Sequence, residues 1–426
     1  MIDKLKNIAG TDLIKTSFFT SIATLVKIAT AFVLNKIVAV YVGPAGVALV
    51  GQFTNFSGII TSIGSGGIGT GIVKYIAENR KKEAEINKII STSFILMLFC
   101  SVIASIVLLV FSEFFSNLIF KSDDYKFVIT LLSFSLVFTS LNTLLLSVLN
   151  GLKEVRKYTW SGISGNLLML IISIALVIKY KLSGVLIAFV AGQSLVFCVT
   201  LFFVARSKWF SIQKFLTHFD KQVLRNLSGF SLMTLVSSFT TPVALIIIRN
   251  YIGKNLSWDD AGYWQGVYSI SEVYLMFITS SLSVYYLPRL SEISNPNELR
   301  DEIFKTSKII FPVISVMALL VFLFKIQIVN ILFTGEFTPM LPLFKFQLLG
   351  DVVKIACWLI SYQMLSKAMT KLFIFTEVFF NLTFVLLTIL FINQFGLEGS
   401  AIAFCANYTL YFIFLLICFR KQFFTR

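Results

Sequence analysis

The sequence predicts an all-α integral membrane protein, with about 12 transmembrane helices in two six-helix lobes around a central polar cavity. First, 57% of the 426 residues are hydrophobic and only 13% are charged, whereas about 25% of the residues in a soluble domain are charged. Second, the apolar residues form blocks of about twenty or more, the length that a helix needs to cross a bilayer. Third, polar side chains recur at helical spacing within several blocks, which indicates helices that line a cavity.

The apolar blocks give twelve predicted spans separated by short links. The spans cover residues 16–42, 46–77, 88–115, 127–150, 158–179, 183–206, 224–250, 261–287, 304–325, 341–366, 370–392 and 397–419. A GPAG turn at 43–46 separates the first two spans. The link 207–223 divides the chain into an N-terminal lobe, 1–206, and a C-terminal lobe, 224–426, with six spans in each.

Basic residues predict the orientation of these spans. In the links, twenty-four lysines and arginines fall on one side of the membrane and six fall on the other. The more basic side is expected to be cytoplasmic, and an even number of spans then places both termini there. The same distribution accounts for the net charge of +15, so no nucleic-acid partner is expected.

Cysteine and histidine give no sign of a metal site. All five cysteines lie within apolar blocks and lack the spacing of metal ligands, and the sole histidine, His218, lies in a polar link. No phosphate-binding G-x-x-x-x-G-K-[ST] motif is present. We therefore expect no bound metal, no cofactor and no catalytic residues, and the chain is not predicted to be an enzyme.

The first two spans contain polar residues that could face the cavity. Lys27 lies well inside the first span, which favours a cavity role, although a side chain that extends to the interface is the alternative. Gln52 and Asn55 are expected to face the interior from the second span. Near the end of that span, Gly67 and Gly71 form a G-x-x-x-G pair, which predicts close helix packing.

The seventh and eighth spans carry a base and a polar face. Arg249 lies at the end of the seventh span, where it could face the cavity or simply anchor the span at the interface. In the eighth span, Gln265, Ser269 and Glu272 fall near one helical face. A carboxylate at this depth is costly unless it meets a partner or water. The span is therefore predicted to line a polar path.

The tenth span has the most regular polar stripe. Its members, spaced four, three and four residues apart, are Gln347, Asp351, Lys354 and Trp358. Asp351 and Lys354 could pair directly as neighbours on the helix, either as a structural ion pair or as part of a transport path. Together the two halves have more intramembrane bases than a plain bundle needs, and a cavity lined by bases attracts an anion.

At these residues the chain resembles the Wzx-type flippases of the multidrug/oligosaccharidyl-lipid/polysaccharide (MOP) exporter superfamily. The stretches that carry the resemblance are TLVKIATAFVLNKIVAVYVGPAG, WDDAGYWQGVYSISEVYLMFITSSLSVYYLPRLS and FTPMLPLFKFQLLGDVVKIACWLISYQMLSKA. The resemblance implies translocation of an undecaprenyl-pyrophosphate-linked oligosaccharide, an O-antigen or enterobacterial common antigen unit, from the cytoplasmic to the periplasmic leaflet of the inner membrane. It also implies alternating access coupled to a proton or sodium gradient.

The resemblance further implies roles for individual residues. At matching positions, Lys27, Arg249 and Lys354 are expected to bind substrate as bases of the lumen, and Glu272 and Asp351 to couple an ion or balance charge. The implied partners are the lipid-linked glycan, membrane lipids, a polysaccharide polymerase and a chain-length regulator. The alternative is a multidrug or cation antiporter of the same superfamily. Such a pump needs acidic groups for a cationic substrate, whereas bases predominate within these spans.

Overall fold

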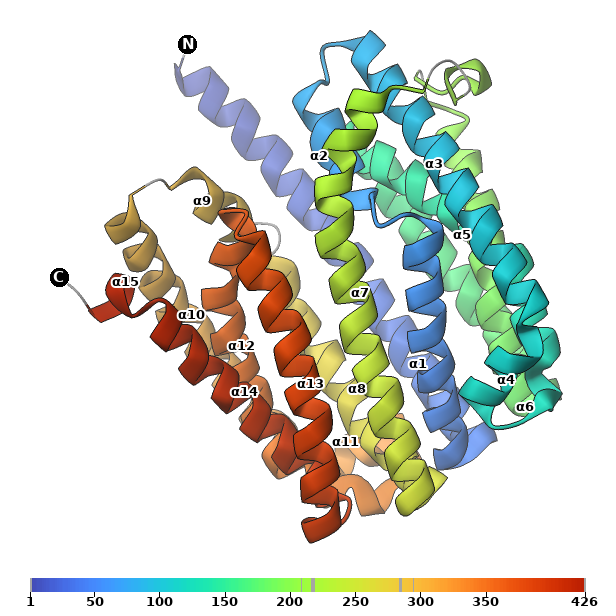
Figure 1. The fold of residues 1–426 in the computed structure, drawn as a ribbon. Helices are drawn as coiled ribbons and strands as arrows, with labels where there is room; N and C mark the ends of the chain where they lie inside the picture. Colours follow the sequence, from blue (N-terminus) through green and yellow to red (C-terminus); the bar gives the residue numbers. More distant parts are fainter. Residues whose placement is uncertain (1, 208, 216–218, 283–285, 294, 425–426) are drawn as a thin grey trace. The chain divides into compact units, whose positions relative to one another are not determined.

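The computed structural model describes residues 2–207, 209–215, 219–282, 286–293 and 295–424, with the side chains of 2–21, 230, 281, 287, 288, 421 and 424 left out. His218 lies outside the described residues. Within them the secondary structure is helical throughout, so the predicted all-α class is confirmed. Figure 1 shows the helices in chain order. They are α1 (Ile2–Gly64), α2 (Gly69–Glu78), α3 (Glu83–Val110), α4 (Ser112–Phe120), α5 (Lys126–Gly151), α6 (Val155–Val204), α7 (Lys221–Asn255), α8 (Trp258–Ser281), α9 (Leu287–Glu292), α10 (Pro296–Leu323), α11 (Lys325–Leu332), α12 (Phe344–Ser366), α13 (Thr370–Phe395), α14 (Glu398–Cys418) and α15 (Arg420–Phe424), with short 3₁₀ segments η1 (Asp123–Tyr125), η2 (Ile212–Phe215) and η4 (Gly335–Leu343).

Two of the long helices are interrupted by a single non-helical residue. In α1 this residue is Gly43, with φ 72° and ψ −175°, immediately before Pro44. In α6 it is Lys181, with φ 48°. Helix α6 therefore covers two of the predicted spans, and α1 covers the first span and the beginning of the second. The break at Gly43 falls in the predicted GPAG turn.

The prediction of an unbroken span over 46–77 is wrong. Helix α1 ends at Gly64, and α2 begins at Gly69. Between them Gly66 and Gly67 have φ values of 61° and 64°, a left-handed backbone that glycine adopts without a steric penalty. Gly67 therefore belongs to a turn and not to the face of a helix as the G-x-x-x-G pattern predicted.

Eight helices of the described residues are long and apolar enough to cross a membrane. They are α1 from Ile22, α3, η1 with α5, α6, α7 from Ser231, α10, α13 and α14. The two helices that carry the predicted polar stripes, α8 and α12, are not among them. The count of twelve spans stays a prediction.

The helices group into two compact units. The first contains residues 1–41 and 56–238, and the second contains residues 42–55 and 239–426. These units differ from the predicted lobes, because 42–55 groups with the C-terminal part of the chain, whereas 224–238 groups with the N-terminal part. The division into functional lobes at 207–223 stays a prediction.

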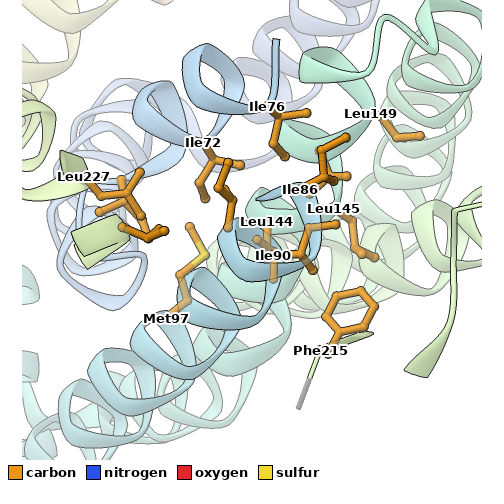
Figure 2. Packing of buried hydrophobic residues seen from close by; sticks show 14 of the residues in the cluster. Ile72, Ile76, Ile86, Ile90, Met97, Leu144, Leu145, Leu149, Phe215 and Leu227 are labelled. Atoms are coloured by element: carbon orange, nitrogen blue, oxygen red, sulfur yellow. The ribbon is translucent and has the colours of Figure 1, made fainter. Parts of the chain in front are cut away.

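An aliphatic core holds the first unit together, as Figure 2 shows. Ile72 and Ile76 of α2 pack there with Met97 of α3 and Leu144 of α5, and all four side chains are buried. The helix pairs α2–α5, α3–α5 and α5–α6 surround this core. Helix α2, although only ten residues long, is thus fixed by burial of its isoleucine face.

We expect Ile72→Ala to destabilise this unit by about 2–5 kcal/mol, because the substitution leaves a cavity that the rigid surroundings fill poorly. Thermal denaturation of the purified protein in detergent measures the change. Ile106→Ala is the matched control, since Ile106 of α3 is 55% exposed and its truncation removes little packing. Equal thermal stability of the two variants would contradict this account of the core.

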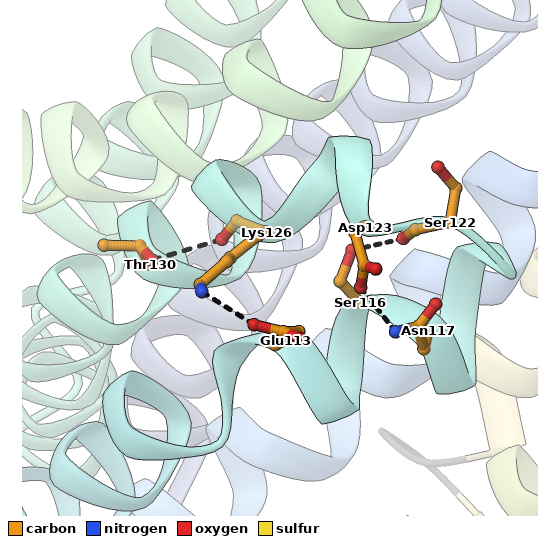
Figure 3. Close-up of polar contacts among 7 residues, drawn as sticks. All are labelled: Glu113, Ser116, Asn117, Ser122, Asp123, Lys126 and Thr130. Atoms are coloured by element: carbon orange, nitrogen blue, oxygen red, sulfur yellow. Dashed lines mark hydrogen bonds and ion pairs between the residues drawn. The ribbon is translucent and has the colours of Figure 1, made fainter.

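Polar contacts close the turn between α4 and α5 in the same unit (Figure 3). The ammonium of Lys126 lies 2.9 Å from Oε2 of Glu113, and the hydroxyl of Ser116 donates a 2.6 Å hydrogen bond to the carbonyl of Ser122. Because both members of the ion pair are more than half exposed, the pair contributes about 1 kcal/mol at most. Its main effect is to define where α5 begins.

In the second unit, α12 packs against α10, α13 and α14, and α8 contacts both α12 and η4. A core cluster joins Ala48 of α1 to α7, α8, α13 and α14 through residues that include Ile248, Trp264, Phe384 and Phe404. The polar groups described next lie on helices of this unit.

Candidate functional site

A fully buried arginine is the centre of the first polar group in the second unit. Nη1 of Arg249, on α7, donates a 2.9 Å hydrogen bond to Oε1 of Gln52 on α1. Its Nη2 donates to Oε1 of Gln265 on α8, and Nε2 of Gln265 donates to the hydroxyl of Ser269 at 3.0 Å. The guanidinium carbon also lies 5.6 Å from the ring centroid of Trp264, within range of cation–π attraction. One cation thus joins three helices.

The start of α8 is fixed by its capping residues. The hydroxyl of Ser257 accepts a 2.9 Å hydrogen bond from the backbone N–H of Asp260, which is the usual role of serine at this position. The negative charge of Asp259, in the first turn, interacts favourably with the positive end of the helix dipole. Its Oδ1 also accepts a 3.0 Å hydrogen bond from the backbone N–H of Ala45, so the beginning of the segment 42–55 is tied to the beginning of α8.

Two glycines let this segment and α8 approach closely. A Cβ atom at Gly262 would lie 2.0 Å from the carbonyl oxygen of Pro44, and one at Gly51 would lie 2.6 Å from the side chain of Gln265. No other residue fits without a shift of the neighbouring atoms. This contact brings Gln52 within reach of the arginine on α7.

A second polar group surrounds a buried carboxylate on α12. Asp351 is fully buried, and its Oδ2 accepts a 2.6 Å hydrogen bond from the hydroxyl of Tyr274 on α8. Its Oδ1 accepts a weaker hydrogen bond, of 3.4 Å, from Nε2 of Gln347 one turn earlier on α12. The two predicted residues of the α12 stripe therefore do contact each other, and α8 supplies a third.

Aromatic rings surround the lysine of the same stripe. The Nζ atom of Lys354 lies between 5.2 and 6.0 Å from four ring centroids. The rings belong to Trp358 on α12, Tyr268 on α8, and Phe404 and Tyr408 on α14. The residue is only 8% exposed. At these distances the faces of aromatic rings attract an ammonium.

Neither buried base forms an ion pair with a carboxylate among the described residues. Arg249 has neutral amides as acceptors, and its Nε has no hydrogen-bond partner in the described part of the chain. The ammonium of Lys354 has aromatic rings as neighbours, and Asp351 accepts hydrogen bonds from neutral donors. Burial of cations without a contacting carboxylate is costly, and the charges of Glu272 and Asp351 offset part of this cost.

The remaining predicted residues lie elsewhere. Lys27 belongs to the first unit, and its side chain is exposed. Asn55 is half-buried at the end of the segment 42–55, and Glu272 is exposed although Ser271 and Val273 beside it are buried. The structure thus brings Gln52, Gln265 and Ser269 together with Arg249 and brings Gln347 together with Asp351. It does not join Lys27 or Asn55 to these groups, whereas the carboxylate of Glu272 lies beside the hydroxyl of Tyr268 and interacts electrostatically with Arg249.

The sequence stripes missed five side chains of this site. They are Trp264, Tyr268, Tyr274, Phe404 and Tyr408. A signal existed for two pairs, because Trp264 and Tyr268 on α8, and Phe404 and Tyr408 on α14, are each four residues apart and therefore share a helical face. Aromatic residues are common in apolar blocks, so this signal is weak without the fold.

We expect Tyr274→Phe to lower the free energy of unfolding by about 1–3 kcal/mol, because a buried carboxylate loses its shortest hydrogen bond. Thermal denaturation in detergent measures this loss. Tyr263→Phe on the same helix is the matched control, since this half-buried hydroxyl has no hydrogen bond to a described side chain. If the two variants lose equal stability, the hydroxyl of Tyr274 is not a significant partner of Asp351.

A family model described as "Polysaccharide biosynthesis protein" matches residues 13–294, which is more than half of the chain. The chain belongs to this family. Two curated members, the Lipid III flippases of Escherichia coli (strain K12) and Shigella flexneri, are each 30% identical over 403 residues, with 94% of this chain and 96% of the relative covered. The polysaccharide biosynthesis proteins of this group are Wzx-type flippases of the MOP superfamily, and the predicted resemblance is confirmed.

Solved structures show the fold of this family member. An outward-facing multidrug resistance MATE family transporter of the MOP superfamily has a TM-score of 0.74 at 15% identity, with 96% of this chain and 95% of that chain covered. The inward-facing form has a TM-score of 0.71 over 94% of this chain and 98% of that chain, again at 15% identity. A MOP superfamily transporter from Pyrococcus furiosus also has a TM-score of 0.71 at 15% identity, with 96% of both chains covered. The chain therefore has the fold of a membrane transporter.

Proposed function

We propose that this chain is a flippase that moves an undecaprenyl-pyrophosphate-linked oligosaccharide from the cytoplasmic to the periplasmic leaflet of the bacterial inner membrane. The observation that carries the proposal is the pair of buried bases, Arg249 and Lys354, neither of which forms an ion pair at contact distance within the described residues. A low-dielectric interior strengthens the attraction of such bases for a diphosphate. The name of the E. coli relative, a Lipid III flippase, points to the same kind of lipid-linked cargo.

The polar groups suit the two chemical parts of that cargo. The arginine has a forked guanidinium that can bind phosphate oxygens through two hydrogen bonds. Amide and hydroxyl groups, such as those of Gln52, Gln265 and Ser269, match the hydroxyl groups of a glycan. The apolar tail of the cargo needs no protein site, because it can stay in the surrounding lipid.

Transport is proposed to run by alternating access, with energy from a proton or sodium gradient. Asp351 is the better candidate for exchange of the coupling ion, because it is fully buried among neutral hydrogen-bond donors. Glu272, which is exposed, is the second candidate for this exchange, or else balances the charge of a nearby base, since its carboxylate interacts electrostatically with Arg249. Both termini are placed in the cytoplasm, and a polysaccharide polymerase and a chain-length regulator are the proposed partners.

Deletion of the gene, followed by analysis of lipid-linked glycans, tests the proposal. A flippase mutant should accumulate the undecaprenyl-pyrophosphate-linked unit on the cytoplasmic side and lose the surface glycan, and expression of the intact chain should reverse both changes. Intact surface glycan together with new sensitivity to toxic organic cations would instead support an antiporter of the same superfamily.

A further inference from the structure

The ammonium of Lys354 has more aromatic neighbours than the proposed function explains. Four rings from three helices lie near the ammonium, with centroids at 5.2 Å (Trp358), 5.7 Å (Tyr408), 5.8 Å (Phe404) and 6.0 Å (Tyr268). A lysine beside lipid usually extends its aliphatic stem along apolar surface and keeps its ammonium in water. Four rings around one Nζ hold it at a defined position.

The carboxylate that should attract this lysine lies three residues away. Asp351 and Lys354 are neighbours on one face of α12, a spacing at which opposite charges usually pair. In the interior that attraction is stronger than at a surface. Yet they form no ion pair in the structure, although both side chains are described.

Each partner is instead held by a different set of groups. Tyr274 and Gln347 donate hydrogen bonds to the two oxygens of Asp351, at 2.6 and 3.4 Å. The rings attract the ammonium from α8, α12 and α14. The two sets of contacts therefore hold the ammonium and the carboxylate out of ion-pair distance, although their charges still interact.

We propose that Trp358 and Tyr408 are positioning residues that hold the ammonium of Lys354 away from Asp351, so that its charge stays available to an anionic group of the cargo. This inference rests on the proposed function, in which Lys354 meets a diphosphate. The rings act through the lysine, and they need not touch the cargo. When the rings are removed, the ammonium moves to the carboxylate and forms a neutral pair that binds anions weakly.

The test is the affinity of the purified full chain in detergent for inorganic pyrophosphate, measured by isothermal titration calorimetry. Trp358→Leu and Tyr408→Leu are each expected to weaken binding about 3-fold, and the double variant about 10-fold, in keeping with the strength of cation–π contacts. Tyr408→Phe keeps the ring and should recover most of the affinity. Phe134→Leu, which removes a ring that is 63% exposed, is the control and should bind as the unaltered chain does.

The decisive variant adds Asp351→Asn to the double ring variant. Without this carboxylate, the freed ammonium loses its oppositely charged neighbour on α12, so pyrophosphate affinity should return to within about 2-fold of that of the Asp351→Asn single variant. A ring that served packing alone would give no such recovery. Absence of recovery, or unchanged affinity in the double ring variant, overturns the proposal.

Two further measurements separate this proposal from the proposed function. If Lys354→Ala loses pyrophosphate binding while the ring variants bind normally, the lysine is an anion site but the rings do not position it. If Lys354→Ala binds normally, both proposals fail at this lysine. Should the double ring variant not fold, Trp358→Leu with and without Asp351→Asn gives the same comparison, because Trp358 is only half-buried.

Discussion

Arg249→Ala is expected to abolish glycan export in a deletion strain while the protein still reaches the membrane. The substitution removes a buried cation that joins α1, α7 and α8 through Gln52 and Gln265. It also leaves the buried amide oxygen of Gln52 without a donor, at about 1–3 kcal/mol, and the partly buried one of Gln265 at less. Quantification of surface glycan and of accumulated lipid-linked glycan, normalised to the amount of protein in the membrane, measures the effect.

Two further variants sharpen this result. Arg249→Lys keeps the charge but provides no planar fork, so we expect partial export. Lys254→Ala is the matched control on the same helix, because its side chain is exposed, and export should be normal. Wild-type export in Arg249→Ala would remove this arginine from the transport path.

Gly262→Ala is expected to lower the free energy of unfolding by about 3 kcal/mol, and to reduce export as well. The added Cβ atom would lie 2.0 Å from the carbonyl oxygen of Pro44. Since a backbone atom cannot rotate aside, the segment 42–55 must move away from α8, a form of overpacking with a large cost. The hydrogen bonds of Ala45 to Asp259 and of Gln52 to Arg249 should weaken together.

Gly58→Ala is the control, and its expected change in stability is opposite to that of Gly262→Ala. Gly58 lies in α1, and a Cβ atom there would meet nothing within 4 Å. Alanine in a helix is favoured over glycine by roughly 0.5–1 kcal/mol, so thermal stability in detergent should rise slightly. If Gly262→Ala and Gly58→Ala have equal midpoints of thermal unfolding, the close contact between Gly262 and Pro44 is absent from the protein in detergent.

The sequence predicted the helices better than their interruptions. Long apolar blocks must be helical in a bilayer, because every backbone polar group needs a partner within its own segment. The GPAG turn was also predicted, because glycine followed by proline marks a break. The break at Gly66 and Gly67 was missed, since the flanking residues are apolar and the same glycines fit a packed helix equally well.

For the candidate site, local spacing predicted the contacts within one helix but not those between helices. The spacing of Gln347 and Asp351 correctly predicts their contact, because one helix determines it. By contrast, Gln52 and Arg249 are 197 residues apart, and no periodicity relates them. The ion pair that the spacing allows between Asp351 and Lys354 is absent from the structure for the same reason: donors and rings from α8 and α14 outweigh the preference of the isolated helix.

The order of synthesis decides which hydrogen-bond partners of Arg249 are present when α7 enters the membrane. A chain that enters the membrane from its N-terminus already contains Gln52 when α7 emerges, whereas Gln265 follows sixteen residues after the arginine. The guanidinium must therefore be accepted by the bilayer with one of its two amide partners available. We expect the amide of Gln52, in the segment 42–55, to stabilise this charge until α8 is complete.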